Sequence, residues 1–130
     1  GCRVGWLETV GGVRSPVAAD ADSLALCAAV APDVVVLVGD ASLGAIGAAR
    51  SAIDSIALGA PALVDRTVVL LNRFDPADAD HRENQRWLAA HLSQPVLTDV
   101  EALVEHLAVP LRRTGGSSDL DGESAREDGR

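Results

Sequence analysis

Two apolar runs constrain the fold of this chain more than any other feature. Residues 33–39 read DVVVLVG and residues 67–72 read TVVLLN, and neither run alternates apolar with polar side chains. A strand with one face in water alternates, whereas a strand buried on both faces is apolar throughout, as in parallel sheets covered by helices on both sides. The two runs therefore predict the interior of an α/β sheet.

Helical patterns separate these runs from each other and from two further apolar segments. Strands are also expected at 3–10 (RVGWLETV) and 95–98 (PVLT), and helices at 20–31, capped by Asp20 or Asp22, at 42–58, with Ser42 as a cap, at 80–92 and at 99–108. Four strand–helix repeats predict a mainly parallel sheet with helices on both faces. We expect this domain to span 1–109, and 110–130, which is rich in Gly, Ser and charge, to be a disordered tail that begins at Pro110.

Charge and residue usage argue against several classes of protein. The net charge is −8, and residues 1–109 hold fourteen acidic residues against seven arginines. Nucleic-acid binding is therefore not expected, and phosphates near this body would need a cation such as Mg²⁺. No run approaches the roughly 18–20 apolar residues of a membrane helix, so no membrane association is expected. Cys2 and Cys27 lack metal-site spacing, which favours free thiols in a cytoplasmic protein.

Polar residues and glycines follow each expected strand, at the edge where parallel sheets bind ligands. The four loops are Glu8–Pro16, Gly39–Gly44 (GDASLG), Asn72–Asp75 (NRFD) and Thr98–Asp99. We expect them to meet at one edge and to form a binding site. The competing interpretation is that loops of this kind are polar and glycine-rich in any α/β protein.

Glu8 and Asn72 are the sharpest single candidates. A carboxylate that ends a buried strand is costly to desolvate unless it meets a cation or several donors, and Mg²⁺ binds one or two carboxylates together with phosphate oxygens. The alternative for Glu8 is a capping acid at a helix start. Asn72 offers a donor and an acceptor to the edge of a base, or else stabilises its own turn. His81, His91 and His106 form no metal set or triad.

Four segments, in this order and spacing, carry a family resemblance over residues 3–108. They read LETVGGVRSPVAADADS, VVVLVGDASLGAIGAARSAI, VVLLNRFDPADADHRENQRWL and PVLTDVEAL. Together they resemble the C-terminal half of dethiobiotin synthetase. The resemblance implies a homodimeric, cytoplasmic enzyme with a P-loop NTPase type of α/β fold, which uses ATP and Mg²⁺ in biotin biosynthesis. In this cyclo-ligase reaction, 7,8-diaminopelargonate takes up CO₂ as a carbamate, ATP phosphorylates the carbamate, and the second amine closes the ureido ring.

The resemblance also implies roles for individual residues. The positions matched to nucleotide binding are Glu8, Thr9, Val10, Gly11, Asn72 and Arg73, with Glu8 as the Mg²⁺ ligand and Asn72 at the adenine. The positions matched to substrate binding are Gly12, Ser15, Pro16, Leu43 and Gly44. Thr98 to Glu101 match loosely a loop that touches the nucleotide. Gly47 stands where the family usually has asparagine.

The lysines of the family have no counterpart in this sequence. The sequence contains no lysine and no G-x-x-x-x-G-K-[ST] phosphate loop, whose lysine reaches the β- and γ-phosphates, so no catalytic residue is assigned. Methionine is also absent, even at position 1, and we expect a fragment that is inactive alone. The alternatives are a cobyrinate or cobyrate synthetase-like or ParA-like ATPase domain, and a non-catalytic dimerisation or binding module.

Overall fold

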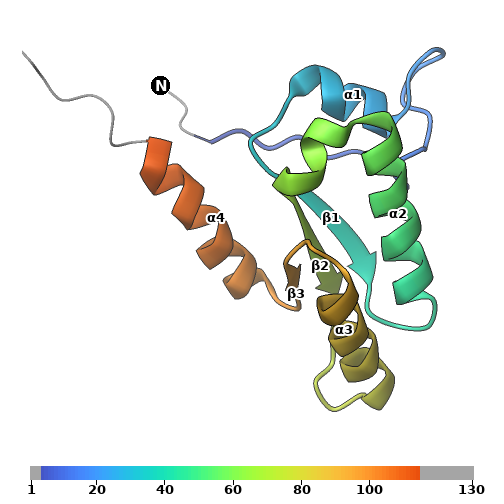
Figure 1. Ribbon diagram of the computed structural model, residues 1–130, viewed down its shortest axis with the longest axis vertical. Coiled ribbons are helices and arrows are strands. Elements are labelled where there is room, and N and C mark those ends of the chain that lie inside the picture. Colours follow the sequence, from blue (N-terminus) through green and yellow to red (C-terminus); the bar gives the residue numbers. More distant parts are fainter. Residues whose placement is uncertain (1–3, 115–130) are drawn as a thin grey trace, which may run out of the picture.

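The protein has an α/β fold, as predicted (Figure 1). The computed structural model describes the backbone of residues 4–114 and the side chains as far as Ala108. The elements in chain order are α1 (Ser23–Val30), β1 (Val35–Asp40), α2 (Ala45–Gly59), the 3₁₀ helix η1 (Pro61–Arg66), β2 (Thr67–Asn72), α3 (Ala79–His91), β3 (Val96–Leu97) and α4 (Val100–Thr114).

The strands form one three-stranded parallel sheet in the order β1-β2-β3. In the register of β1 and β2, Val35 lies beside Thr67 and Asp40 lies beside Asn72, so the two strands begin and end together. Within the described residues no strand pairs with the outer edge of β1. The three later strands predicted from the sequence are confirmed, the central one with identical bounds.

β2 is the centre of the fold because both of its faces are buried. Val69 and Leu71 pack with side chains of α2 and α3 on one face of the sheet. Val68 and Leu70 pack with side chains of α4 on the other face. Helices therefore lie on both faces, which is why the four positions 68–71 are all apolar, while the buried hydroxyl of Thr67 donates to the carbonyl oxygen of Leu63. Each such side chain contributes about 1.5–3 kcal/mol by leaving water.

Aspartates begin two of the helices. Asp22 accepts a hydrogen bond at its Oδ1 from the amide of Ala25, 2.8 Å away, and so caps α1. Asp78 caps α3 in the same way, because its Oδ1 accepts from the amides of Asp80 and His81. These caps satisfy amides that the first turn of a helix leaves free. The helices expected at 20–31 and 80–92 are thereby confirmed.

Two helix ends differ from expectation. α2 begins after Gly44, which has a left-handed φ of 91°, and not after a cap at Ser42. Ser42 instead belongs to the preceding turn, where its backbone and hydroxyl both donate to Asp40. α4 continues through Pro110 to Thr114, where we expected ordered structure to end. A proline in a helix interior lacks the backbone donor and disfavours continuation of the helix, so its position predicted an end that the backbone does not show.

The strand expected at 3–10 is not formed in the described residues of that segment, 4–10. Residues 4–9 have no regular secondary structure, and Trp6, Leu7 and Val10 are exposed. A β-rich sequence becomes a strand only where a neighbouring edge accepts its backbone bonds and a core accepts its side chains. Residues 1–3, with Cys2, and residues 115–130 of the expected tail lie outside the described part of the chain.

Candidate functional site

Polar residues at the carboxyl ends of β1 and β2 form one connected group, which we call the carboxyl-edge cluster: Asp40, Ser42, Asn72, Arg73 and Asn84. Asp40 Oδ2 lies 2.7 Å from Arg73 Nη2, so the ends of the two strands are joined by an ion pair. The other carboxylate oxygen of Asp40 accepts from the amide of Ser42 at 2.9 Å and from its hydroxyl. Both oxygens of this carboxylate are therefore directed by named donors.

Arg73 has an uncommon backbone conformation that directs its side chain toward β1. Its φ is 56°, in the left-handed region, which costs about 1–2 kcal/mol for a residue with a side chain. The side chain of Asn72 supports this turn, because its Oδ1 accepts from the Arg73 amide at 3.0 Å. The conformation ends β2 abruptly and brings the guanidinium to Asp40 on the neighbouring strand.

Asn84 of α3 holds the turn after β1 in place. Its Nδ2 donates to the carbonyl oxygens of Ala41 and Ser42, at 3.0 and 3.1 Å. Two bonds from one amide link α3 to a segment more than forty residues earlier in the chain. The turn that carries Ser42, Leu43 and Gly44 is therefore anchored both to its own strand and to a helix.

The NRFD loop after β2 is closed against the start of α3. The amide of Asp75 donates to His81 Nδ1 at 3.0 Å, and the Asp75 carboxylate accepts from the amide of Ala77 at 2.8 Å. The rings of Phe74 and His81 lie 6.1 Å apart. His81 is thus a structural residue of this loop, in agreement with the absence of a histidine triad or metal set in the sequence.

The charges of the cluster compensate each other. Hydrogen bonds from the Ser42 side chain and backbone, followed by the positive charge of Arg73, hold the pKa of Asp40 below its usual value. Asp40 is therefore ionised at neutral pH, and the ion pair with Arg73 carries no net charge. The Arg73 side chain is 78% exposed and that of Asp40 is 42% exposed, so the pair is open to a ligand.

The first predicted loop, Glu8–Pro16, lies at the opposite end of the sheet. Val13 packs in the cluster that contains Leu24 of α1 and Ile56 of α2, near the start of β1. Arg14 lies close to Gly59, where α2 ends after running back from the carboxyl edge. In Figure 1 the segment before α1 crosses the amino ends of the strands. The expectation that four loops meet at one edge is therefore wrong for this loop.

The physical reason is the missing strand at 3–10. Without it, the loop is positioned by α1, whose Ser23 and Leu24 amides donate to the carbonyl oxygens of Ser15 and Val13, both at 2.9 Å, and by the packing of Val13 against the end of α2. The structure therefore separates the predicted nucleotide-binding residues into two groups. Glu8, Thr9, Val10 and Gly11 lie with the substrate-binding candidates Gly12, Ser15 and Pro16, whereas Asn72 and Arg73 lie with Leu43 and Gly44.

The glycine turn itself has a structural explanation. Gly11 has a left-handed φ of 85°, and a Cβ at this position would collide with the Ser15 hydroxyl. The amide of Ser15 donates to the carbonyl of Gly12 at 2.9 Å and closes the turn. Glu8 is exposed at its entrance. Within residues 4–114, as far as the structure describes them, no group of three or more His, Cys, Asp or Glu side chains is placed so that it could hold a metal ion.

The other two predicted loops do lie at the carboxyl edge. Leu43 is fully exposed and Gly44 directly precedes α2, beside the cluster. Asp99 follows β3, and its Oδ1 accepts from the amide of Ala102 at 2.7 Å, so Asp99 starts α4. Thr98 donates to the other Asp99 oxygen at 3.4 Å. Both residues already have a structural role in this loop.

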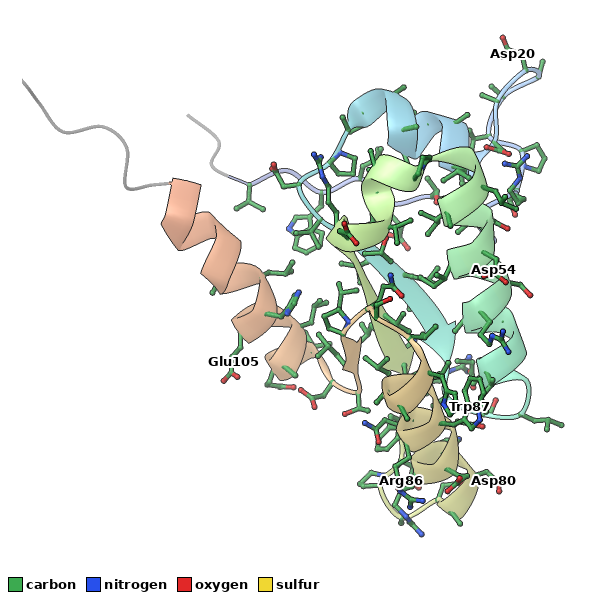
Figure 2. All side chains as sticks on the ribbon, in the orientation of Figure 1. Asp20, Asp54, Asp80, Arg86, Trp87 and Glu105 are labelled. Atoms are coloured by element: carbon green, nitrogen blue, oxygen red, sulfur yellow. The ribbon has the colours of Figure 1, made fainter. Side chains whose placement is uncertain are left out.

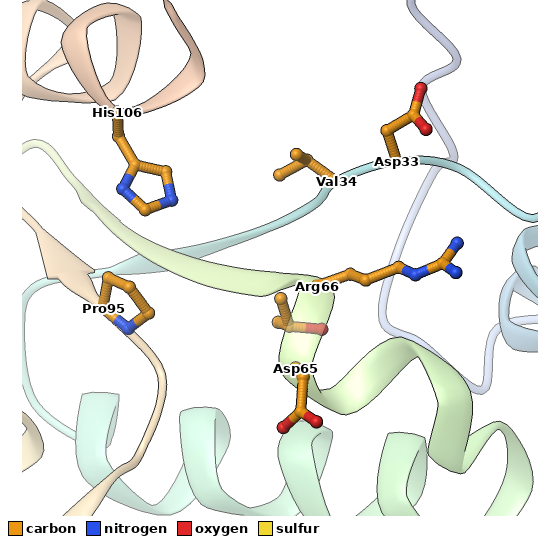
Figure 3. Close-up of a pocket in the computed structure, with 7 residues that line it drawn as sticks. Asp33, Val34, Asp65, Arg66, Pro95 and His106 are labelled. Atoms are coloured by element: carbon orange, nitrogen blue, oxygen red, sulfur yellow. The ribbon is translucent and has the colours of Figure 1, made fainter. Parts of the chain in front are cut away.

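A pocket of about 260 Å³ lies at the amino ends of β1 and β2, away from the carboxyl-edge cluster (Figure 3). Its lining residues are Asp33, Val34, Asp65, Arg66, Thr67, Pro95 and His106. Arg66 donates to the Pro32 carbonyl at 3.0 Å, and the Thr67 hydroxyl donates to the Leu63 carbonyl at 2.8 Å. These polar groups are thus engaged with the protein itself, and none of the sequence motifs falls in this pocket.

Three cluster residues were not among the individual site candidates from the sequence: Asp40, Ser42 and Asn84. Asp40 is the last residue of an apolar run, the same signal that singled out Glu8. Asn84 lies four residues before the fully buried Leu88, on the side of α3 that faces the sheet. A polar amide on that side needs a partner in the interior, and this spacing is the signal for it.

Comparison with protein-family models, curated proteins and solved structures found no match to this chain. Within the part of the chain that the structure describes, no helix has the length and apolar character needed to cross a membrane. The sequence motifs and the geometry of the carboxyl-edge cluster therefore carry the functional assignment.

Proposed function

We propose that this chain is the C-terminal part of an ATP- and Mg²⁺-dependent dethiobiotin synthetase, a cyclo-ligase with a P-loop NTPase type of fold. Its substrates are 7,8-diaminopelargonate and CO₂, and it acts as a homodimer in the cytoplasm. The observation that carries the proposal is the position of Asn72 and Arg73, which end the central strand at the edge where parallel sheets bind ligands.

The side chain of Asn72 is suited to the edge of an adenine base. It is exposed, and its Oδ1 has a second lone pair free after accepting from the Arg73 amide. No acceptor among the described residues takes a hydrogen bond from its Nδ2. One asparagine amide can pair with both N6 and N7 of adenine. The alternative that Asn72 serves only its own turn leaves this second half of the amide without a role.

The outer edge of β1, which no strand of the described residues joins, supports a further part of the proposal. Val38, near the end of this strand, is 57% exposed, which is unusual in the interior of a parallel sheet. A strand that paired with β1 in parallel would end next to Asp40 and Ser42. We place the phosphate loop, which this sequence lacks, on such a strand. The loop would then follow the strand directly beside the carboxyl-edge cluster.

The reaction requires positioning and compensation of phosphoryl charge more than a protein nucleophile. The residues of this chain would hold the base end of ATP, while a lysine outside this sequence would contact the phosphates. Glu8 does not fit a Mg²⁺ role in the described arrangement, because it lies at the other end of the sheet, and we assign no step to it. The proposal requires residues 4–10 to become a strand when their sheet partner is present.

Turnover tests the proposal. The 130-residue chain alone is expected to form no dethiobiotin and to hydrolyse no ATP, and turnover by it would refute the fragment assignment. In a longer gene product that carries a phosphate loop, Asn72→Ala should raise KM for ATP about tenfold or more, since a good bidentate contact to a base supplies about 1–3 kcal/mol. Unchanged KM values for ATP would remove Asn72 from the base site.

A second candidate is a non-catalytic dimerisation or binding module. The separation of Glu8 from Asn72 is the observation that favours it, because two parts of one active site should not lie at opposite ends of a sheet. Isothermal titration with ATP and with 7,8-diaminopelargonate separates the candidates. A module that has lost its chemistry should bind neither compound even when a phosphate loop is present, whereas the synthetase should bind both. A cobyrinate synthetase-like or ParA-like ATPase should bind ATP and not the diamine.

A further inference from the structure

The orientation of Arg73 is fixed by more contacts than is usual for an exposed arginine. Its backbone is fixed in a left-handed turn by Asn72, and its guanidinium is fixed by Asp40 at 2.7 Å. Asp40 is in turn fixed by two donors from Ser42. A single exposed ion pair contributes little to stability, so the arrangement is better explained by orientation of the guanidinium than by stabilisation of the fold.

The same arrangement makes Arg73 a poor phosphate ligand. Its charge is compensated by Asp40, and the protein around it carries a net charge of −8. An arginine that binds phosphate uses its unpaired charge and its fork of donors. Here one edge of the fork already faces a carboxylate. What remains open is the flat face of the guanidinium, on a side chain that is largely exposed.

We propose that Asp40 is a positioning residue that holds Arg73 as a charge-compensated platform on which a purine base stacks, with the edge of the base at Asn72. A planar guanidinium stacks on aromatic rings, and Asn72 lies beside Asp40 in the register of the sheet. The inference rests on the proposed function in one respect, because it takes a nucleotide to bind at this edge. It goes beyond the proposed function by assigning Arg73 to the base of the nucleotide and not to its phosphates.

The test compares the affinities of the 130-residue chain for adenosine and for ATP, measured at low salt by titrations followed in ¹H–¹⁵N spectra. If Arg73 contacts the base, Arg73→Ala weakens the binding of both compounds by the same factor, roughly fivefold or more. Arg73→Lys, which keeps the charge and loses the plane, behaves like Arg73→Ala. Loss of ATP binding alone in Arg73→Ala would show a phosphate ligand and overturn the inference.

Asp40→Asn tests the positioning role directly. It keeps an acceptor for Ser42 but leaves Arg73 with an unpaired charge, so the preference for ATP over adenosine should rise about fivefold or more. Asp54→Asn is the matched control, because it removes the same charge from an exposed position on α2 (Figure 2). If the ratio of ATP affinity to adenosine affinity were equal in Asp40→Asn and Asp54→Asn, the inference would be overturned while the proposed function stands. Absence of any response at Asn72 in the wild-type chain would overturn both.

Discussion

Replacement of Asn84 by alanine tests how the carboxyl edge is held together. The variant removes two hydrogen bonds, from Nδ2 to the carbonyl oxygens of Ala41 and Ser42. A net contribution of about 0.5–1.5 kcal/mol per bond gives about 1–3 kcal/mol in total. The bond to Ser42 is exposed, so water replaces part of it, whereas the bond to Ala41 is partly buried. We therefore expect a loss of about 1–2 kcal/mol in the free energy of unfolding.

Urea unfolding followed by circular dichroism measures this loss, with an unchanged m-value if only stability changes. Gln85→Ala is the matched control, because it removes the neighbouring amide side chain from the same helix and should stay within about 0.5 kcal/mol. Asn84→Asp should cost at least as much as Asn84→Ala, since it places a carboxylate against two carbonyl oxygens. Equal stabilities of the Asn84 and Gln85 variants would refute the role of Asn84 as an anchor of the turn.

Three further predictions concern the core, the capping acid of α3 and the free thiol. Leu88→Ala should lower the free energy of unfolding by about 2–5 kcal/mol, because Leu88 is fully buried between α3 and the sheet. Leu58→Ala, at an exposed position of α2, should leave this free energy almost unchanged. Similar urea midpoints for the two variants would contradict the packing. Hydrogen bonds from the backbone amides of His81 and Asp80 lower the pKa of Asp78 in the folded state. The contribution of Asp78 to stability is therefore present above the unfolded pKa of about 3.9 and is lost as pH falls through the folded pKa. Asp78→Asn should flatten the acid limb of a stability–pH curve, and an unchanged limb would count against the cap. Burial raises the pKa of the Cys27 thiol, so in a Cys2→Ser background at pH 8 it should react with Ellman's reagent more slowly than in the urea-unfolded chain, and equal rates would show that this thiol is accessible.

The sheet could be predicted from the sequence because its signal is local. The run TVVLLN is apolar without alternation, and only a position buried on both faces explains that composition. The strand–helix alternation then leaves a parallel order as the simplest solution. The cap at Asp22, one of the two that the sequence offered, is equally local, since a cap acts within three residues of its own position, whereas the cap at Asp78 was not predicted.

The segment at 3–10 shows that local sequence signals alone do not determine whether a strand forms. Its composition is that of a strand, but a strand also needs a neighbouring edge, and that edge is not contained in the segment itself. Because residues 4–10 form no strand of the sheet, Glu8 lies at the amino ends of the sheet with the loop that follows it. The prediction of the loop at Gly11 is still useful, because the left-handed glycine and its contact with Ser15 depend only on neighbouring residues.

Only part of the carboxyl-edge cluster could be predicted from the sequence, because its contacts also depend on tertiary structure. Asn72 and Arg73 stand out as polar residues at the end of a strand, and the structure confirms their place at the carboxyl edge. The partner of Arg73 depends on the register of two strands that are separated by a whole helix. Asp40 becomes that partner only because β1 and β2 end at the same level. Pairing of this kind follows from tertiary structure and not from sequence spacing.

Mapping of adenosine binding onto the wild-type chain tests the central claim most directly. The claim is that the ligand site lies at the carboxyl ends of β1 and β2. Titration with adenosine, followed in ¹H–¹⁵N spectra, should shift the side-chain amide of Asn72 and the backbone amides of Arg73 and Ser42. Shifts confined to Val34, Thr67 and His106, which line the pocket at the opposite end, would contradict the claim. So would a spectrum that adenosine leaves unchanged.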